Sequence, residues 1–75
     1  MMNANALKAK MAFAGLSAKT LCQMCGIGLS AFYRKLTGAS EFTQSEIARI
    51  AAALHLTHDE IYEIFFCRES VLNDT

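Results

Sequence analysis

The residues with the clearest chemical potential lie in one stretch near the middle of the chain, residues 16–38. Cys22 and Cys25 have the CxxC spacing found in metal sites and in redox-active thiol pairs. Ser30 and Arg34 follow soon after them. Hydroxyl and guanidinium groups bind the phosphates and base edges of nucleic acids. The stretch could therefore serve either metal or redox chemistry, through its cysteines, or nucleic-acid binding.

Two short helices are expected to position these residues. Ser17 is a good N-terminal cap for a helix over 18–25, and a second helix is expected over 29–36 before a stop at Gly38. Between them, Gly26 stands where a sharp turn needs a positive φ, which glycine adopts at little cost. This is the layout of a helix-turn-helix.

The thiols of Cys22 and Cys25 are expected to be buried, because the helix needs small apolar side chains at both positions. A zinc site would need further ligands from Cys67, His55 or His58. No second CxxC pair and no HxxxH pair supports such a site. The sequence therefore predicts core cysteines, with no metal and no cofactor.

The second helix of the pair is expected to present a polar face. If Phe32 and Leu36 point inward, Ser30 and Arg34 point to solvent on the opposite side. A helix fits the major groove of DNA, where Arg34 can donate two hydrogen bonds to one guanine and Ser30 can bond a base edge or a phosphate. Leu29 either extends the buried stripe or contacts a thymine methyl group. Leu29, Ser30 and Arg34 are the predicted base contacts.

Residues around this face are predicted to hold the phosphate backbone, which positions a protein without reading sequence. Some would act through their side chains and others through exposed N–H groups at helix starts. The predicted phosphate contacts are Ser17, Lys19, Tyr33, Lys35 and Thr43.

The charges are divided along the chain, although the formal net charge is +0. Residues 1–40 contain no acidic residue and five basic ones, which gives +5. From Glu41 onward the chain contains seven acidic residues and two arginines, which gives a net charge of −5. The half with the two-helix motif should therefore attract a phosphate backbone.

Three further helices are expected around the motif. A first helix over 3–14 would bury Leu7, Met11 and Ala14 and end at Gly15, with Phe13 lying on the surface across a neighbouring loop rather than on a partner. Helices over 44–54 and 58–66 each follow a capping-box pattern. The capping residues are Thr43 with Glu46 and Thr57 with Glu60, and the inward residues are Ile47, Ile50, Ala51, Leu54, Ile61, Ile64 and Phe65. The sequence predicts one all-α domain of five helices over 1–66 and a polar tail over 67–75.

The chain resembles the helix-turn-helix proteins of the phage repressor and Cro family over about residues 7–66. The matching residues are Leu21, Cys22, Gly26, Ile27, Phe32 and the run 33–38. The resemblance implies a compact five-helix bundle of the lambda-repressor type and base contacts at Leu29, Ser30 and Arg34. Ala18 stands where the family often has a phosphate-binding Gln, and Gly28 stands where it usually has a Ser or Thr cap. Both departures should lower the affinity for DNA.

Other classes of protein fit the sequence less well. No apolar run approaches the roughly 18 residues of a membrane span, and no signal peptide is expected at the start. An odd count of three cysteines suits a reducing compartment, so a cytoplasmic protein is expected. A 75-residue helical domain leaves little room for a substrate pocket, and no enzyme activity or small-molecule ligand is predicted.

Tyr62 and Phe66 form a second apolar stripe on the last helix, beside its buried one. This stripe predicts a homodimer interface, which would present two recognition helices to a pseudo-palindromic operator in double-stranded DNA. The predicted function is a phage or prophage repressor or Cro-like protein that acts by promoter occlusion. The alternative is a protein-binding adaptor or antitoxin-like module on the same fold.

Overall fold

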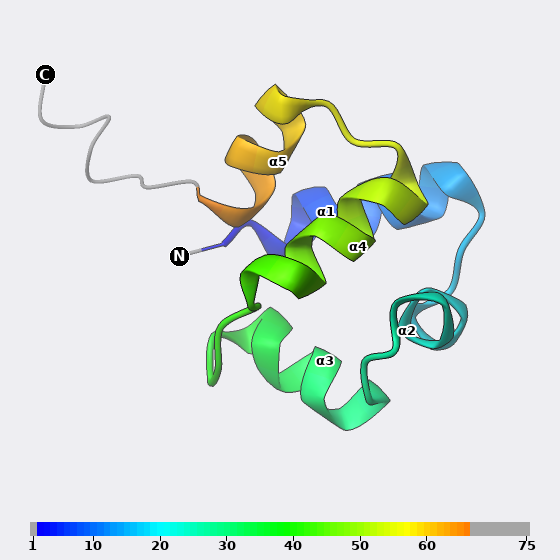
Figure 1. The fold of residues 1–75 in the computed structure, drawn as a ribbon, viewed down its shortest axis with the longest axis vertical. Helices are drawn as coiled ribbons and strands as arrows, with labels where there is room; N and C mark the ends of the chain where they lie inside the picture. The colour runs from blue at the N-terminus through cyan, green and yellow to red at the C-terminus, as the bar shows by residue number, and fades with distance from the viewer. Residues whose placement is uncertain (1, 67–75) are drawn as a thin grey trace, which may run out of the picture.

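The computed structural model describes residues 2–66, which form five α-helices (Figure 1). The helices are α1 (Ala4–Ala14), α2 (Ala18–Cys25), α3 (Leu29–Thr37), α4 (Gln44–Leu54) and α5 (His58–Phe65). Each helix begins and ends within one residue of the range predicted from the sequence. The prediction of an all-α fold with five helices is confirmed, and the predicted tail over 67–75 lies outside the described residues.

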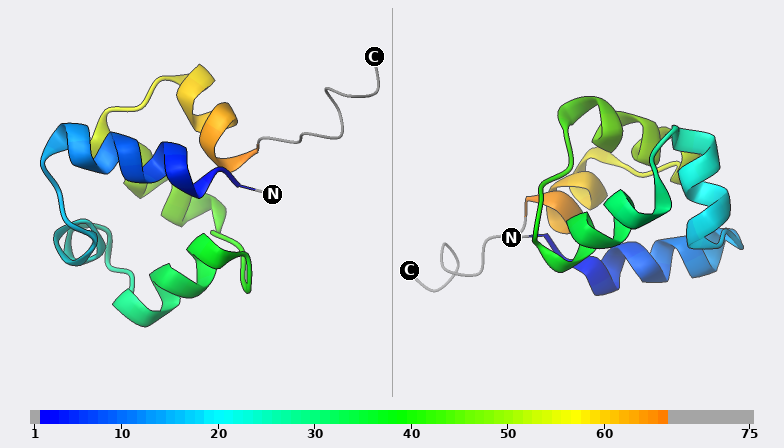
Figure 2. Two further views of the ribbon diagram at one scale, coloured as in Figure 1. Left: turned by 180° about the vertical axis from the view of Figure 1, so that it is seen from behind. Right: turned by 90° about the horizontal axis from the view of Figure 1, so that it is seen from below.

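Helix α4 is at the centre of the packing. It contacts α1, α2 and α5, while α2 also packs on α3 and α1 on α5. The view from behind shows the same arrangement, with α3 at one side of the bundle and α5 at the other (Figure 2, left). In Figure 1, α2 is seen almost along its axis while α3 lies across the picture. The two helices are therefore steeply inclined to each other, as in a helix-turn-helix.

The core is continuous from the helix-turn-helix to the last helix. Its largest fully buried side chains are Phe32, Leu7, Leu21, Ile50 and Ile64. Phe42, in the loop between α3 and α4, meets Phe32 edge-on at 5.8 Å between ring centroids and Phe65 at 5.5 Å. These aromatic contacts fix α3 to the α4–α5 half of the molecule, so the orientation of α3 is set by the core.

The first and last helices are joined at their ends. The Asn3 backbone N–H donates to the Ile64 carbonyl at 2.6 Å, and the Asn3 side chain caps α1 by accepting from the Ala6 N–H at 3.0 Å. The two described ends of the chain therefore lie side by side, as Figure 1 shows.

Two predictions for α1 are wrong. Ala14 is exposed, so the buried stripe consists of Leu7 and Met11. Phe13 is 93% exposed and does not lie across a neighbouring loop. The helix ends immediately after Phe13 and Ala14, at Gly15 with φ 73°. None of the helices within residues 2–66 has the length and apolar character that crossing a membrane requires.

Candidate nucleic-acid interface

The turn between α2 and α3 is built as predicted. The Ser17 hydroxyl accepts from the Thr20 N–H at 3.1 Å and caps α2. Gly26 ends α2 with φ 68°, and the next N–H, that of Ile27, donates to the Cys22 carbonyl at 3.0 Å. Ile27 is buried directly after the turn. A positive φ at Gly26 and a buried Ile27 together fix the direction in which α3 leaves α2.

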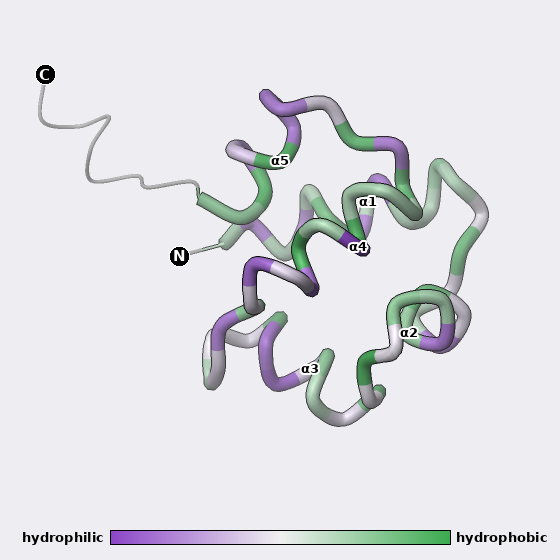
Figure 3. The backbone as a smooth tube through the Cα atoms, in the orientation of Figure 1, coloured by the Kyte–Doolittle hydropathy of each residue, from purple (hydrophilic) through white to green (hydrophobic). Residues whose placement is uncertain are grey.

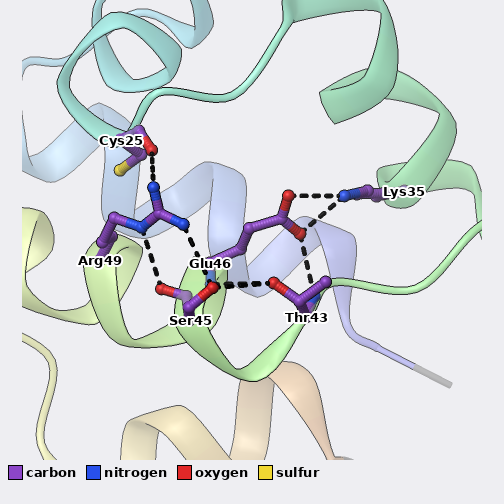
Figure 4. A network of polar contacts seen from close by, with 6 residues as sticks. All are labelled: Cys25, Lys35, Thr43, Ser45, Glu46 and Arg49. Atoms are coloured by element: carbon purple, nitrogen blue, oxygen red, sulfur yellow. Dashed lines mark hydrogen bonds and ion pairs between the residues drawn. The ribbon is translucent and has the colours of Figure 1, made fainter.

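Arg49 of α4 forms hydrogen bonds that hold the end of α2 next to this turn (Figure 4). Its Nη1 donates to the Cys25 carbonyl at 3.0 Å, and its Nε and Nη2 donate to Ser45. Cys25 is the last residue of α2, where carbonyl groups lack helical partners and a cation is favourable. Arg49 thus ties the end of α2 to α4 and completes the helix terminus.

The outer face of α3 carries the predicted base contacts. Ser30 and Arg34 are both exposed, and the Arg34 guanidinium forms no ion pair within residues 2–66. Leu29 is 41% exposed at the start of the helix, so it does not join the buried stripe. The inner face holds Phe32, which is fully buried. The three predicted residues Leu29, Ser30 and Arg34 therefore lie together on the open side of α3.

Lys35 has a different role from the one predicted. Its Nζ lies 2.6 and 2.7 Å from the two carboxylate oxygens of Glu46, and its side chain is only 14% exposed. The same ammonium group stands 5.8 Å from the centre of the Phe42 ring. The phosphate contact at Lys35 stays a prediction, and this placement counts against it because the ammonium group already donates to an anion of the protein. Lys35 instead holds α3 against the start of α4.

The two helix starts predicted to meet phosphate differ in charge. At Thr43 the capping box is complete: Glu46 accepts from the Thr43 N–H at 2.9 Å, and the Thr43 hydroxyl accepts from the Glu46 N–H at 3.1 Å. The Glu46 carboxylate occupies the place that a phosphate would take, which argues against Thr43 as a phosphate contact. The first turn of α2, after Ser17, contains no acidic residue.

The basic side chains that remain available to a ligand lie in the half of the chain that contains the helix-turn-helix. Lys10 pairs with Glu60 and Lys35 with Glu46, whereas Lys8, Lys19 and Arg34 form no ion pair within residues 2–66. Lys19 on α2 and Tyr33 on α3 are both exposed, with Tyr33 at 49%, and remain predicted phosphate contacts. The hydrophilic part of α3 is its second half, next to the start of α4 (Figure 3).

The thiols do not belong to this surface. Cys22 and Cys25 are 4% and 2% exposed and pack in the core. Burial raises the pKa of both thiols, and the nearby Arg49 offsets part of the rise at Cys25. Both groups are neutral at physiological pH, as side chains that pack rather than react. Among residues 2–66 no three His, Cys, Asp or Glu side chains gather in a way that would hold a metal ion.

Sequence reasoning missed Arg49, which shapes the site, and His55, which ends α4. Arg49 carried no signal of its role, because its partner Cys25 is 24 positions away and is reached through a backbone carbonyl. His55 ends α4 in the left-handed conformation, with φ 54°, at a position where glycine is usual. The sequence did indicate a turn at His55. The apolar pattern of α4 ends at Leu54 and the cap of α5 is Thr57, so the chain has to change direction between these two residues.

The predicted dimer residues Tyr62 and Phe66 are exposed at 58% and 46% and stack at 6.3 Å between ring centroids. They belong to α5 and the residue that follows it, and they line one pocket together with Lys35 and Gly38 at the end of α3.

Comparison with protein families matches residues 4–66 to the BetR domain. Comparisons with curated proteins and with solved structures found no match. BetR domains are helix-turn-helix-like DNA-binding domains, which agrees with the α2–α3 geometry and with the cationic residues beside it. The matched region spans all five helices. The chain belongs to the BetR domain family and contains a DNA-binding helix-turn-helix of the kind that transcription regulators carry.

Proposed function

We propose that this protein is a sequence-specific regulator that inserts α3 into the major groove of double-stranded DNA. The observation that carries the proposal is the open face of α3, where Ser30 and Arg34, which has no ion pair within residues 2–66, lie beside the exposed Leu29. An arginine with free donors can donate one hydrogen bond to guanine O6 and another to guanine N7, and no other base presents this pair of acceptors in the major groove. Ser30 and Leu29 add a hydrogen-bonding group and an apolar group to the same face.

The phosphate contacts in this proposal are fewer than the sequence predicts. Lys19, Tyr33 and the N–H groups that follow Ser17 are the candidates that remain, while Lys35 and Thr43 are engaged with Glu46. Gly28 begins α3 without a side-chain cap, and Ala18 adds no donor. Specificity in this account depends on Arg34 more than on an extensive backbone clamp.

We further propose that the protein binds as a homodimer and acts by occlusion, as a phage-type repressor does. The stacked, exposed Tyr62 and Phe66 supply an apolar surface on α5 that a second copy can cover. A dimer places two α3 helices about 34 Å apart, one turn of B-form DNA, and so selects a pseudo-palindromic operator. Occlusion needs only that the bound protein cover a promoter, so DNA binding is sufficient for it.

We also propose that the protein acts by binding rather than by catalysis and that it acts in the cytoplasm. The neutral, buried thiols of Cys22 and Cys25 support both statements, because reduced cysteines persist in that compartment and buried ones are poor nucleophiles.

The test is selection of bound duplexes from a random pool, followed by titration of the selected duplex at several salt concentrations. We expect a two-part motif with half-sites about one helical turn apart, and an affinity that falls steeply with salt because counterions are released from the DNA. Failure to enrich any sequence, together with salt-independent retention, would overturn the proposal.

The second candidate function is a protein-binding adaptor or antitoxin-like module. The exposed aromatic pair of Tyr62 and Phe66 favours it, since such residues are also frequent at interfaces with other proteins. The two functions differ in the selection experiment, because an adaptor returns no enriched duplex.

A further inference from the structure

Helix α3 is the one described helix that begins without a side-chain cap. The other four helices each follow a residue whose side chain accepts a hydrogen bond from an N–H group of the first turn: Asn3, Ser17, Thr43 and Thr57. Gly28, at the start of α3, makes no such bond. Local contacts therefore determine the beginning of α3 less firmly than they determine the beginnings of its neighbours.

The turn that leads into α3 is rich in glycine. Of its three residues, Gly26 and Gly28 are glycines, and the positive φ of Gly26 sets the direction of α3. Glycine can leave such a conformation at little cost. The N–H groups of Gly26 and Ile27 both donate to the Cys22 carbonyl, so these backbone bonds join the turn to α2 alone. The angle between α3 and the rest of the molecule consequently depends on contacts from outside the motif.

Arg49 supplies such a contact at the turn. Its Nη1 donates to the Cys25 carbonyl at 3.0 Å, and a Cβ on Gly26 would lie 3.6 Å from the same nitrogen. The Cys25 carbonyl belongs to the planar peptide group that joins Cys25 to Gly26, and this group would have to rotate if φ of Gly26 changed. The guanidinium is held in turn by Ser45, whose carbonyl and hydroxyl accept from Nε and Nη2 at 3.2 Å.

The second half of α3 is held by the same face of α4. Lys35 donates to Glu46, which precedes Arg49 by three positions and so lies beside it on the helix surface. Figure 4 shows both contacts in one view, with Arg49 reaching the end of α2 and Glu46 reaching Lys35. Helix α4 thus holds α3 at two points, one at the turn before it and one in its second half.

We propose that Arg49 is a positioning residue for DNA recognition. By holding the peptide group between Cys25 and Gly26, it fixes the angle at which α3 leaves the turn. That angle places the outer face of α3 relative to the helices that pack behind it. Without Arg49, α3 remains attached through Lys35 and can pivot about that end. The placement of α3 stands on these contacts alone, whereas its effect on base reading rests on the DNA binding proposed above.

The first measurement tests the angle of α3 and needs no DNA. Residual dipolar couplings of backbone N–H groups report helix orientations in solution, and we would compare the wild type with Arg49→Met, which removes every donor of the side chain. We expect the couplings of α1, α4 and α5 to fit one unchanged frame, and those of α3 to depart from it. Arg49→Lys, whose ammonium group can still donate to the Cys25 carbonyl, should stay close to the wild type. If the α3 couplings of Arg49→Met fit the unchanged frame, the proposal is overturned.

The second measurement is the ratio of the affinity for the selected duplex to the affinity for an unrelated duplex. A variant that is merely less stable loses both affinities by the same factor, so this ratio reports specificity rather than folding. Arg49→Met should lower the ratio by about fivefold or more, because a misplaced α3 loses discrimination of at least the size that one bidentate contact provides.

The matched control is Lys10→Met, which also replaces one cation by methionine but breaks the ion pair with Glu60 between α1 and α5. Lys10→Met should leave the ratio unchanged. Equal ratios for wild type and Arg49→Met, or an equal fall in Lys10→Met, would overturn the role of Arg49 in recognition. If the wild type binds no duplex, the proposed function and this role both fail, while the couplings still decide whether Arg49 places α3.

Discussion

Arg34 and Lys35 are neighbours in the sequence and point to different sides of α3. Arg34 is exposed and forms no ion pair within residues 2–66, whereas Lys35 donates to both carboxylate oxygens of Glu46 and is largely buried. The helical pattern alone predicted the exposure of Arg34, because Phe32 and Leu36 define the inner side. It could not predict the Lys35 pair, since the partner is 11 positions away on α4 and is brought close only by the aromatic packing around Phe42.

Replacing Lys19 and Lys35 by alanine separates a ligand contact from a structural contact. Lys19→Ala should weaken binding to all duplexes alike and reduce the slope of log affinity against log salt by about 1, because one phosphate contact is lost. Lys35→Ala should leave that slope unchanged and lower the free energy of unfolding by about 1–3 kcal/mol, because Glu46 loses a largely buried partner. Salt titrations and urea unfolding of both variants measure these effects. A reduced salt slope in Lys35→Ala would return Lys35 to the DNA contacts.

At the scale of elements, the helix starts were the most predictable part of the fold. Ser17, Thr43 and Thr57 all cap helices as predicted, because a capping residue and its N–H partner are only three positions apart. Helix ends were predictable where glycine supplies the positive φ, as at Gly26. The end of α4 at His55 lacks that signal, and the exposure of Phe13 depends on where the chain goes after α1.

One substitution at the start of α3 should increase the stability of the protein. Gly28 has φ −66° and ψ 142°, which any residue adopts, and a Cβ added there would meet nothing within 4 Å. Gly28→Ser should stabilise the protein by about 0.5–1 kcal/mol, by capping α3 and by restricting the unfolded chain. Thermal or urea unfolding measures the gain, and Gly26→Ser is the matched control. That control should destabilise the protein because Gly26 has φ 68°. A loss of stability in Gly28→Ser would contradict the described start of α3.

The two capping boxes should make the fold sensitive to acid. Lys35 and the Thr43 N–H lower the pKa of Glu46 below its ordinary value of 4.5, and Lys10 and the Thr57 N–H do the same for Glu60. Because the folded values are lower than the unfolded ones, this stabilisation is present above pH 4.5 and is lost as the pH falls through the folded values. Urea unfolding at a series of pH values should show the decline below about pH 4.5. Glu46→Gln should be less stable at neutral pH and show a smaller decline; an unchanged acid dependence would rule out Glu46 as a source.

At the scale of the whole molecule, charge and apolar surface are arranged around α3. Three basic residues of α1–α3 form no ion pair with the described part of the chain, and all precede its acidic residues: Lys8, Lys19 and Arg34. Apart from Tyr33 on α3, the exposed aromatic residues of the described part of the chain are Phe13 near the end of α1 and Tyr62 and Phe66 at α5. The charge division was readable from the sequence. The relative placement of these aromatic residues was not, because it depends on how α1 and α5 pack.

The central claim is that Arg34 on the outer face of α3 reads a base in the major groove. The most direct measurement is the affinity of wild type and Arg34→Ala for the selected duplex and for a set of duplexes with one base pair changed in each half-site. We predict that the wild type discriminates by about 1–3 kcal/mol at one G·C pair per half-site, and that Arg34→Ala loses discrimination at that pair alone. Equal discrimination by both proteins at every position would contradict the claim.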